Sequence, residues 1–301
     1  MTGPQGIGSA PCITVERLCR VAEVSRASFY RHWHETEPRT EETAVRDAIQ
    51  RLCLAHRHYG YRRIGVLLHR DGWQVNHKRV LRLMREDNLL CLRRRPFVPL
   101  TTNSRHGWEV VPNLARGMRL SGIDQLWVAD ITYVRLAEAF VYLAVILDAF
   151  SRKVIGWALE EHMRAELALA ALEMAIDARR PTRGSVIHHS DRGVQYACYE
   201  YTALLDRHDI QASMSRLGNP YDNAKAERFM RTLKEEEVDG RDYRDVADAR
   251  AQVASFIETY NRQRLHSALD YLSPDEYEDA CSEQRRPAVL SGENNRICHP
   301  V

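Results

Sequence analysis

A single aspartate in the middle of an apolar, β-branched segment places the strongest constraint on the fold. Residues 126–134 read Leu-Trp-Val-Ala-Asp-Ile-Thr-Tyr-Val, a pattern typical of a buried β-strand. A carboxylate buried in such a strand without a partner costs several kcal/mol. Asp130 therefore needs a cation or hydrogen-bond donors close to it.

Two further acids lie at positions that suit a divalent cation. Asp191 follows the β-like run 185–188 and precedes a glycine turn, so its carboxylate lies just past a strand end. Glu227 lies in the early turns of a helix-forming run for which Asn223 is a good N-cap. Mg²⁺ takes one or two protein carboxylates and keeps its other positions for water and phosphate. The pattern favours a metal site over a backbone-bonded aspartate accompanied by unrelated surface acids.

The spacing of these residues supports the same interpretation. Asp191 and Glu227 are separated by 35 residues. Lys234 follows Glu227 by seven residues, or two helical turns, so the two side chains face the same side of the helix. This arrangement pairs a metal ligand with a cation that can bind phosphate.

The order of elements around the three acids indicates an α/β fold. We expect strands at 126–134, 140–147, 153–160, 186–188 and 210–213, and helices at 165–179, 197–207, 223–237 and 246–260. A loop at 216–222 could close over a substrate. This is the order of a ribonuclease H-like fold with a five-stranded mixed sheet. There the middle of the first strand, the end of the fourth strand and a later helix converge, which are the places of Asp130, Asp191 and Glu227.

The region before this core is basic and helical. Residues 51–119 contain 15 Lys and Arg against 4 Asp and Glu, an excess typical of contact with phosphate backbones. Residues 13–30 follow a helix-turn-helix pattern with Thr14 and Ser25 as N-caps, and a second helical unit spans 44–85 with Asn76 as an N-cap. Its last helix is either a DNA-contacting helix or an ordinary amphipathic core helix. The candidate DNA-binding residues are Arg62, Arg63, Lys78, Arg79, Arg82, Arg231 and Lys234.

Together these patterns predict the organisation of the whole chain. The expected parts are a leader with a helix-turn-helix-like unit (1–40), a basic helical DNA-binding domain (41–95), a basic linker (96–122), a catalytic core that carries the three acids (123–280) and a disordered tail (281–301). The seven cysteines form no CxxC pair, which favours reduced thiols in the cytoplasm. The longest apolar run, 140–147, is too short to span a membrane, and we expect no membrane partner.

Several ordered motifs carry a resemblance to a known family. Residues 14–278 resemble the second-frame, catalytic product of bacterial insertion-sequence family three transposases, and Asp130, Asp191 and Glu227 resemble the D,D(35)E triad of transposases and retroviral integrases. The motifs are Tyr59-Gly60-Tyr61-Arg62-Arg63-Ile64, Asn76-His77-Lys78-Arg79-Val80, Trp127-Val128-Ala129-Asp130-Ile131-Thr132-Tyr133, Ser190-Asp191-Arg192-Gly193-Val194-Gln195-Tyr196, Asn219-Pro220-Tyr221-Asp222-Asn223-Ala224 and the run from Tyr260-Asn261-Arg262 to Pro274.

This resemblance implies a DNA transposase in which residues 123–280 form an integrase-type catalytic core that uses two Mg²⁺ or Mn²⁺ ions. One site would nick the ends of the element and join the exposed 3′-hydroxyl to a new phosphodiester. Asp130 would bridge both ions, Asp191 and Glu227 would each complete one, and Lys234 would hold DNA phosphate. The implied partners are terminal inverted repeats, target DNA, further copies of the chain on DNA, and a first-frame subunit or frameshift fusion. The implied location is the nucleoid in a bacterial cytoplasm.

Some roles remain open at this level. Asp148 is either a fourth acid near the metals or a strand-end turn residue, and His188 and His189 either contact the site or are satisfied internally. Asn223 is a cap or a DNA contact, while Asn261 and Arg262 bind DNA or pack the C-terminal helix. Two other functions compete: a nuclease of the same fold that hydrolyses without joining, and a DNA-binding regulator whose core is inactive.

Overall fold

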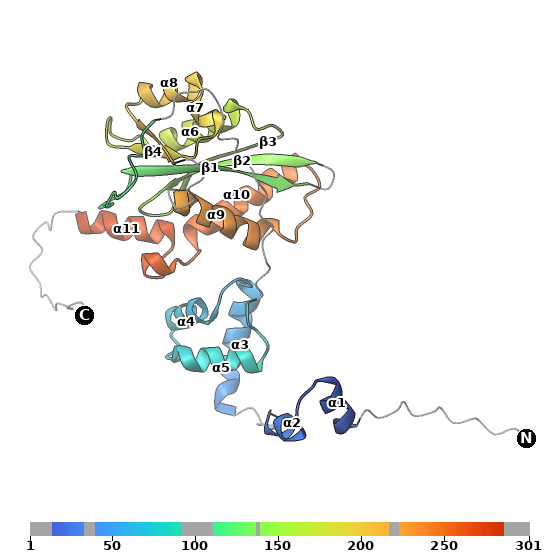
Figure 1. Cartoon of the computed structure of the whole chain (residues 1–301). Helices are drawn as coiled ribbons and strands as arrows, with labels where there is room; N and C mark the ends of the chain where they lie inside the picture. Colours follow the sequence, from blue (N-terminus) through green and yellow to red (C-terminus); the bar gives the residue numbers. More distant parts are fainter. Residues whose placement is uncertain (1–13, 33–39, 92–110, 137–138, 217–222, 286–301) are drawn as a thin grey trace, which may run out of the picture. The chain divides into compact units, whose positions relative to one another are not determined.

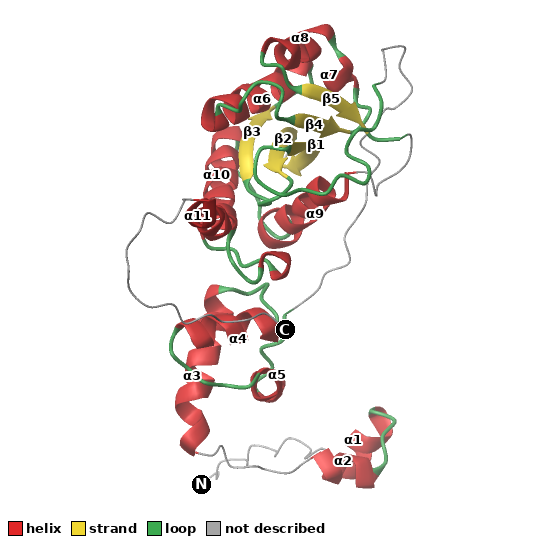
Figure 2. Ribbon diagram, turned by 90° about the vertical axis from the view of Figure 1, so that its left-hand side faces the viewer, coloured by secondary structure: helices red, strands yellow, loops and turns green. Residues whose placement is uncertain are grey.

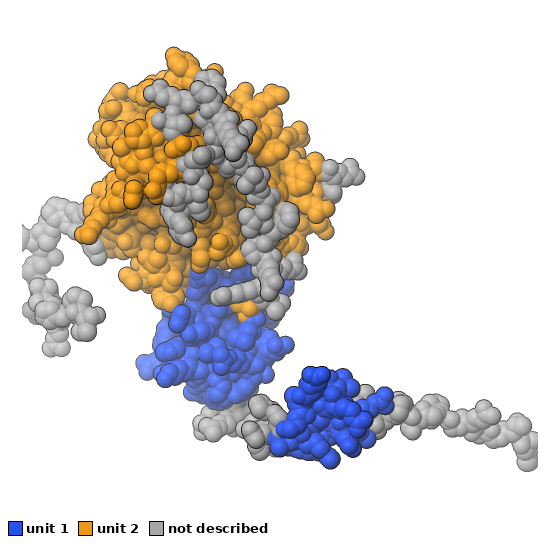
Figure 3. Space-filling model, viewed as in Figure 1, with its two compact units in different colours: residues 1–90 blue, residues 91–301 orange. Residues whose placement is uncertain are grey.

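The computed structural model describes residues 14–32, 40–91, 111–136, 139–216 and 223–285. The chain divides into two compact units, residues 1–90 and 91–301 (Figure 3). The predicted closing loop (216–222), apart from Arg216, most of the predicted linker (96–110) and the segment 286–301 lie outside the described residues. No helix in the described segments combines the length and apolarity that a membrane crossing requires.

The N-terminal unit consists of short helices, as expected. The helices are α1 (Val15–Val21), α2 (Arg26–His32), α3 (Thr40–Ala55), α4 (Tyr61–Arg70) and α5 (His77–Glu86). Thr14 and Asn76 cap α1 and α5, since their side-chain oxygens accept hydrogen bonds from the backbone N–H of Arg17 (3.4 Å) and Lys78 (2.8 Å). The helices α3, α4 and α5 pack together over a small core. Its fully buried side chains are Ile49, Ile64, Leu68, Val80, Leu83 and Met84.

The second unit is built on one five-stranded mixed sheet. The strands are β1 (Leu126–Arg135), β2 (Phe140–Asp148), β3 (Val154–Glu160), β4 (Ile187–Ser190) and β5 (Gln211–Met214), in the order β3-β2-β1-β4-β5. The first three form an antiparallel meander, while β4 and β5 run parallel to β1. Pairing of β1 with β4 extends only from Leu126 to Val128, although β1 continues to Arg135. The edge of β1 beside β4 is therefore covered for only part of its length.

Helices cover both faces of this sheet (Figures 1 and 2). On one face lie α6 (Ala165–Arg179), α7 (Val194–Ala197) and α8 (Tyr199–Arg207), and on the other lie α9 (Ala224–Leu233) and α10 (Val246–Arg262). The alanine-rich α6 packs very close to β3 at Gly156, which has no Cβ atom. A Cβ atom at this position would lie 2.2 Å from the carbonyl oxygen of Ala171, so the close approach requires glycine. The two layers of apolar contacts hold β1 in the centre of the unit.

Three sequence-based expectations are wrong in detail. The helix expected at 197–207 begins only at Tyr199, because Cys198 is extended and separates α8 from the short α7 before it. Asn223 occupies the N-cap position of α9, but its side chain makes no capping hydrogen bond. The tail expected from residue 281 begins too early, because α11 (Pro274–Arg285) continues through Arg285. A ring contact of Phe150 with Tyr277, 5.4 Å between centroids, holds this helix on the core.

Candidate active site

Asp130 lies in the central strand on the face that α9 covers. It is paired across the sheet with Val145 of β2, and its neighbours Val128 and Val134 belong to the apolar layer beneath α9 and α10. The side chain is half-buried. Among the described residues, its carboxylate accepts one hydrogen bond, from the backbone N–H of Ile131 at 2.9 Å. The sequence predicts that Asp130 needs a cation or hydrogen-bond donors, and the described residues provide it with few donors.

Asp191 lies immediately after β4, beside the middle of β1. Because β4 is parallel to β1 and Val128 pairs with His189, the end of β4 lies level with Asp130. One carboxylate oxygen of Asp191 accepts a hydrogen bond from the backbone N–H of Gly193 at 2.9 Å. A Cβ atom on Gly193 would lie only 3.0 Å from that same oxygen. Glycine at this position thus allows the turn that orients the Asp191 carboxylate.

Glu227 comes to the site on α9, in the first turn of the helix. Its side chain is exposed, and α9 packs against β1 and β2. Partial burial raises the pKa of Glu227, while the charge of Arg231, one turn further along α9, lowers it. The expected contact of Arg231 with DNA stays a prediction; in the structure this exposed cation lies near the carboxylate of Glu227.

The three carboxylates form one electrostatic site. Burial and the charges of Asp191 and Glu227 together raise the pKa of Asp130 to about 8, against the hydrogen bond from Ile131 and the charge of Lys234, which lower it. Each contribution comes from a different element: β1, the turn after β4, and α9. In the described residues, however, no three His, Cys, Asp or Glu side chains lie close enough together to form a ready-made metal site. The acids are brought near one another but are not closed around a common point.

Lys234 lies beside the same strand. It begins a π-helical turn, Lys234–Val238, that continues α9, and its ammonium nitrogen is 4.6 Å from the ring centroid of Tyr133 on β1. Burial lowers the pKa of Lys234, while the charges of Asp239 and Asp130 raise it. The sequence indicated the cation but not its aromatic support. The position of Tyr133, three residues after Asp130 on the same strand, was the available signal.

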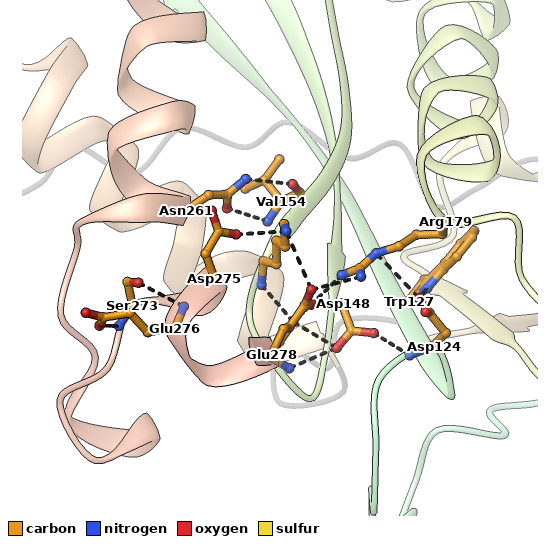
Figure 4. Close-up of polar contacts among 12 residues, drawn as sticks. Asp124, Trp127, Asp148, Val154, Arg179, Asn261, Ser273, Asp275, Glu276 and Glu278 are labelled. Carbon is orange, nitrogen blue, oxygen red and sulfur yellow. Dashed lines mark hydrogen bonds and ion pairs between the residues drawn. The ribbon is translucent and has the colours of Figure 1, made fainter. Parts of the chain in front are cut away.

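Asp148 is a structural residue at the end of β2 (Figure 4). Its carboxylate is fully buried and accepts backbone hydrogen bonds from Asp124 (2.7 Å), Phe150 (2.9 Å) and Ser151 (2.8 Å). Burial raises the pKa of Asp148, and these hydrogen bonds and the charge of Arg179 lower it. Of the two interpretations of Asp148, the structure supports the turn residue.

The structure gives the other open residues partners within the protein, although Arg262 is largely exposed and its contact with DNA stays a prediction. The ring nitrogens of His189 lie 2.8 and 3.0 Å from the hydroxyls of Ser213 and Ser215, and His188 Nε2 lies 2.9 Å from the hydroxyl of Tyr201. Both histidines are buried and satisfied, and burial lowers the pKa of His188 to about 3. Asn261 exchanges two hydrogen bonds with the backbone of Val154, and Arg262 pairs with Glu258 one turn earlier in α10, at 2.7 Å.

The predicted DNA-binding cations of the N-terminal unit fall into three groups. Arg79 and Arg82 on α5 both pair with Glu42 of α3, at 3.4 and 2.6 Å, and Glu42 is almost completely buried. Lys78 is exposed and makes no ion pair within the described residues. On α4, Arg62 and Arg63 lie over the rings of Tyr61 and Tyr59, at 5.4 and 5.0 Å from the centroids. The arginines of α5 therefore stabilise the unit, whatever their role toward DNA.

Comparisons with known proteins match both units. Integrase core domain models match residues 122–220 and 208–274, and an HTH-like domain model matches residues 40–97. The magnesium complex of the HTLV-2 integrase catalytic core domain aligns with 53% of this chain and 99% of its own, with a TM-score of 0.40 and 14% identity. The five-stranded mixed sheet with its helices is an integrase catalytic core, and a helical HTH-like region precedes it.

Two relatives resemble almost the whole chain. The insertion element IS600 uncharacterized 31 kDa protein of Shigella sonnei is 38% identical over 263 residues, which cover 85% of this chain and 96% of the relative. Transposase InsF for insertion sequence IS3A of Escherichia coli strain K12 is 37% identical over 274 residues, covering 88% and 94%. Since this identity extends over nearly the full length of both relatives, the chain belongs to the insertion-sequence family three transposases, as a DDE-type enzyme with an integrase core.

Proposed function

We propose that this transposase cuts the ends of its insertion sequence and joins each 3′-hydroxyl to a new phosphodiester, with Asp130, Asp191 and Glu227 as ligands of two Mg²⁺ or Mn²⁺ ions. The observation that carries the proposal is the convergence of three acids from separate elements, the middle of β1, the turn after β4 and the first turn of α9, and this convergence contributes to the raised pKa of Asp130. Mutually repelling carboxylates with few protein donors are in an unfavourable state that a hard divalent cation relieves.

The donor set fits such ions. Carboxylate oxygens are the ligands that Mg²⁺ and Mn²⁺ prefer, and Mg²⁺ accepts as few as one or two protein carboxylates. Because the three acids are not closed around one point in the described residues, we infer that cation binding draws them together. Asp130, on the rigid central strand, would be shared by both ions, and Asp191 and Glu227 would each complete one. When bound, the metal pair supplies an activated oxygen nucleophile and charge stabilisation for the leaving oxygen.

The remaining residues of the site orient DNA. Lys234 is held over Tyr133 and lies close enough to Asp130 for their charges to interact. An ammonium at this place would bind the phosphate next to the scissile bond. In the N-terminal unit, exposed Lys78 and Arg62 would contact the phosphate backbone of the terminal inverted repeats. The complete reaction would require further copies of the chain on DNA, and a first-frame subunit or fusion could supply additional DNA contacts.

The test is a joining assay with labelled DNA that carries the element's own ends. The wild type, Glu227→Gln and the control Glu173→Gln are compared in Mg²⁺, Mn²⁺ and EDTA; Glu173 is an exposed glutamate of α6. We expect metal-dependent cleavage and joining in the wild type and the control, and neither in Glu227→Gln.

Three outcomes would contradict the proposal. Joining by Glu227→Gln would remove Glu227 from the ligand set. Cleavage without joining would favour a hydrolytic nuclease. DNA binding without chemistry, even after the first-frame protein is added, would favour an inactive regulator.

A further inference from the structure

Asn223 makes an unexpected contact between α9 and the central strand. The residue is only 6% exposed, and its amide nitrogen donates a hydrogen bond to the backbone carbonyl of Ala129 at 2.8 Å. Ala129 immediately precedes Asp130 in β1. Although Asn223 occupies the N-cap position, its side chain makes no capping hydrogen bond with the first turn of α9. The side chain therefore connects α9 to β1 instead of capping α9.

The strand edge explains why β1 accepts this contact. The carbonyl of Gln125 accepts a hydrogen bond from the N–H of Ile187, so the carbonyls of odd-numbered residues along this strand face β4. Ladder pairing with β4 ends at Val128. The carbonyl of Ala129 is the next one on this edge, and the amide of Asn223 provides it with a donor where the ladder stops.

The contact joins the elements that carry two of the three acids. Glu227 follows Asn223 by four residues, so the two side chains lie on the same face of α9, one turn apart. Asp130 follows Ala129 by one residue. A single hydrogen bond thus fixes the first turn of α9 against the backbone beside Asp130. Because α9 contributes an exposed glutamate to the site, its register against β1 determines where the carboxylate of Glu227 lies.

We propose that Asn223 is a positioning residue, which acts through its hydrogen bond to Ala129 to hold Glu227 within reach of the metal ions that Asp130 binds. The inference rests on the metal-dependent function proposed above. The amide oxygen of Asn223 is buried and has no hydrogen-bond partner in the described part of the chain. A residue that only packed α9 on the sheet would leave this acceptor unpaired at a cost, whereas at a site loaded with metal and DNA it is available to a hydrated ligand.

Asn261 offers a matched control in the same unit. It also connects a helix to a strand edge through its amide, because it donates to the carbonyl of Val154 and accepts from the N–H of Val154, both at 2.9 Å (Figure 4). Both of its hydrogen-bonding groups are used, and it lies between α10 and β3, the edge strand that carries none of the three acids. Loss of either asparagine removes a helix–strand contact, but only loss of Asn223 should disturb the site.

The experiment compares Asn223→Ala, Asn223→Ser and Asn261→Ala in the full chain. Serine caps helices well but is one bond too short to replace the amide, so Asn223→Ser separates capping from positioning. The first readout is the rise in melting temperature that Mn²⁺ produces without DNA. The second is the Mn²⁺ concentration that gives half-maximal joining. We expect both Asn223 variants to need about tenfold more Mn²⁺ in each assay and to join about 10 to 100 times more slowly. Asn261→Ala should lower the melting temperature while its Mn²⁺ dependence stays that of the wild type.

The results separate the two proposals. The positioning role would be overturned if Asn223→Ala had the Mn²⁺ dependence of the wild type. It would also be overturned if Asn223→Ser had that dependence while Asn223→Ala did not, because capping would then explain the effect. An equal loss in Asn261→Ala would also overturn it, because any loosened helix would then produce the effect. If the wild-type protein itself shows neither a Mn²⁺-induced shift nor joining, the proposed function fails instead. Should Asn223→Ala not fold, Asn223→Asp provides the test: its activity relative to the wild type should increase as the pH falls, because only a protonated carboxyl can donate to Ala129.

Discussion

Two groups of acids in the same unit differ in what the protein provides for them. Around Asp148, three backbone N–H groups point at one carboxylate, and Glu278 receives hydrogen bonds from Arg179 and Ser151. Burial alone would raise the pKa of Glu278, but Arg179 and Ser151 bring it below its ordinary value. Around Asp130, the neighbours are Asp191 and Glu227, which add to the effect of burial. The first group is complete without a ligand, and the second is not.

This difference distinguishes structural acids from functional ones. A buried carboxylate with donors and a guanidinium helps hold the fold, and its loss leaves those donors unpaired. A carboxylate that lies near other carboxylates destabilises the fold until a cation binds. Sequence position does not separate the two, since Asp130 and Asp148 are both aspartates in apolar strands of the same sheet. Removing each acid should therefore change stability in opposite directions.

Asp130→Asn should produce the largest effect on activity and a gain in stability. Without this ligand, joining should fall by about 10³-fold or more, because several kcal/mol of metal-supplied stabilisation are lost. The neutral amide also removes the cost of keeping this carboxyl protonated beside Asp191 and Glu227, so the melting temperature in EDTA should rise by about 2 °C or more. Differential scanning calorimetry and the joining assay check the two effects. A fall in melting temperature would contradict the comparison.

Asp148→Ala should give the reverse result. The backbone N–H groups of Asp124, Phe150 and Ser151 would lose their acceptor in a fully buried position, and Arg179 would lose a nearby countercharge. We expect a loss of about 3 kcal/mol or more in the free energy of unfolding. Urea denaturation measures this loss. At a temperature where the variant is folded, its Mn²⁺ dependence should be that of the wild type; a change there would make Asp148 part of the metal site after all.

The stability of the metal-free protein should depend on pH with opposite signs at the two sites. The pKa of Asp130 is raised to about 8 in the folded protein, against about 4 in an unfolded chain. Between these values the unfolded state has released the proton that the folded state keeps, so this group makes the protein less stable as the pH rises. In EDTA, the melting temperature of Asp130→Asn should therefore exceed that of the wild type by an amount that grows from pH 6 to pH 8. In Mn²⁺ this difference should be smaller than in EDTA.

Glu278 provides the control for that measurement. Its folded pKa is lowered, so its contribution to stability is present above its unfolded pKa and is lost as the pH falls through the folded value. The difference between the wild type and Glu278→Gln should therefore be constant from pH 6 to pH 8 and decrease only in acid. Equal slopes for Asp130 and Glu278 between pH 6 and pH 8 would show that the two sites do not differ as described.

Much of the fold follows from local sequence patterns, whereas the details of the site do not. Strand β1 and helix α6 are readily predicted, since a largely apolar, β-branched strand and an alanine-rich amphipathic helix leave few alternatives. The positions of the three acids follow from topology once the order of strands is known. The bond from Asn223 to Ala129 could not be predicted, because it joins residues 94 positions apart and replaces a local cap. Helix α11 was missed because its polar composition resembles a tail, while single contacts such as Tyr277 with Phe150 hold it.

The same distinction between partnered and unpartnered charges should apply, with smaller effects, to the N-terminal unit. Lys78 is exposed and has no ion pair in the described residues, whereas Arg82 pairs with buried Glu42. Lys78→Ala should weaken DNA binding a few-fold, lower the salt dependence by about one phosphate contact, and leave the melting temperature unchanged. Arg82→Ala should lower the melting temperature only slightly, because Glu42 keeps Arg46 and Arg79 as partners. Fluorescence anisotropy at several salt concentrations measures both variants. If Arg82→Ala reduces the salt dependence of DNA affinity as much as Lys78→Ala does, one cation can both stabilise the fold and bind DNA. The absence of an ion pair would then not identify the residues that bind DNA.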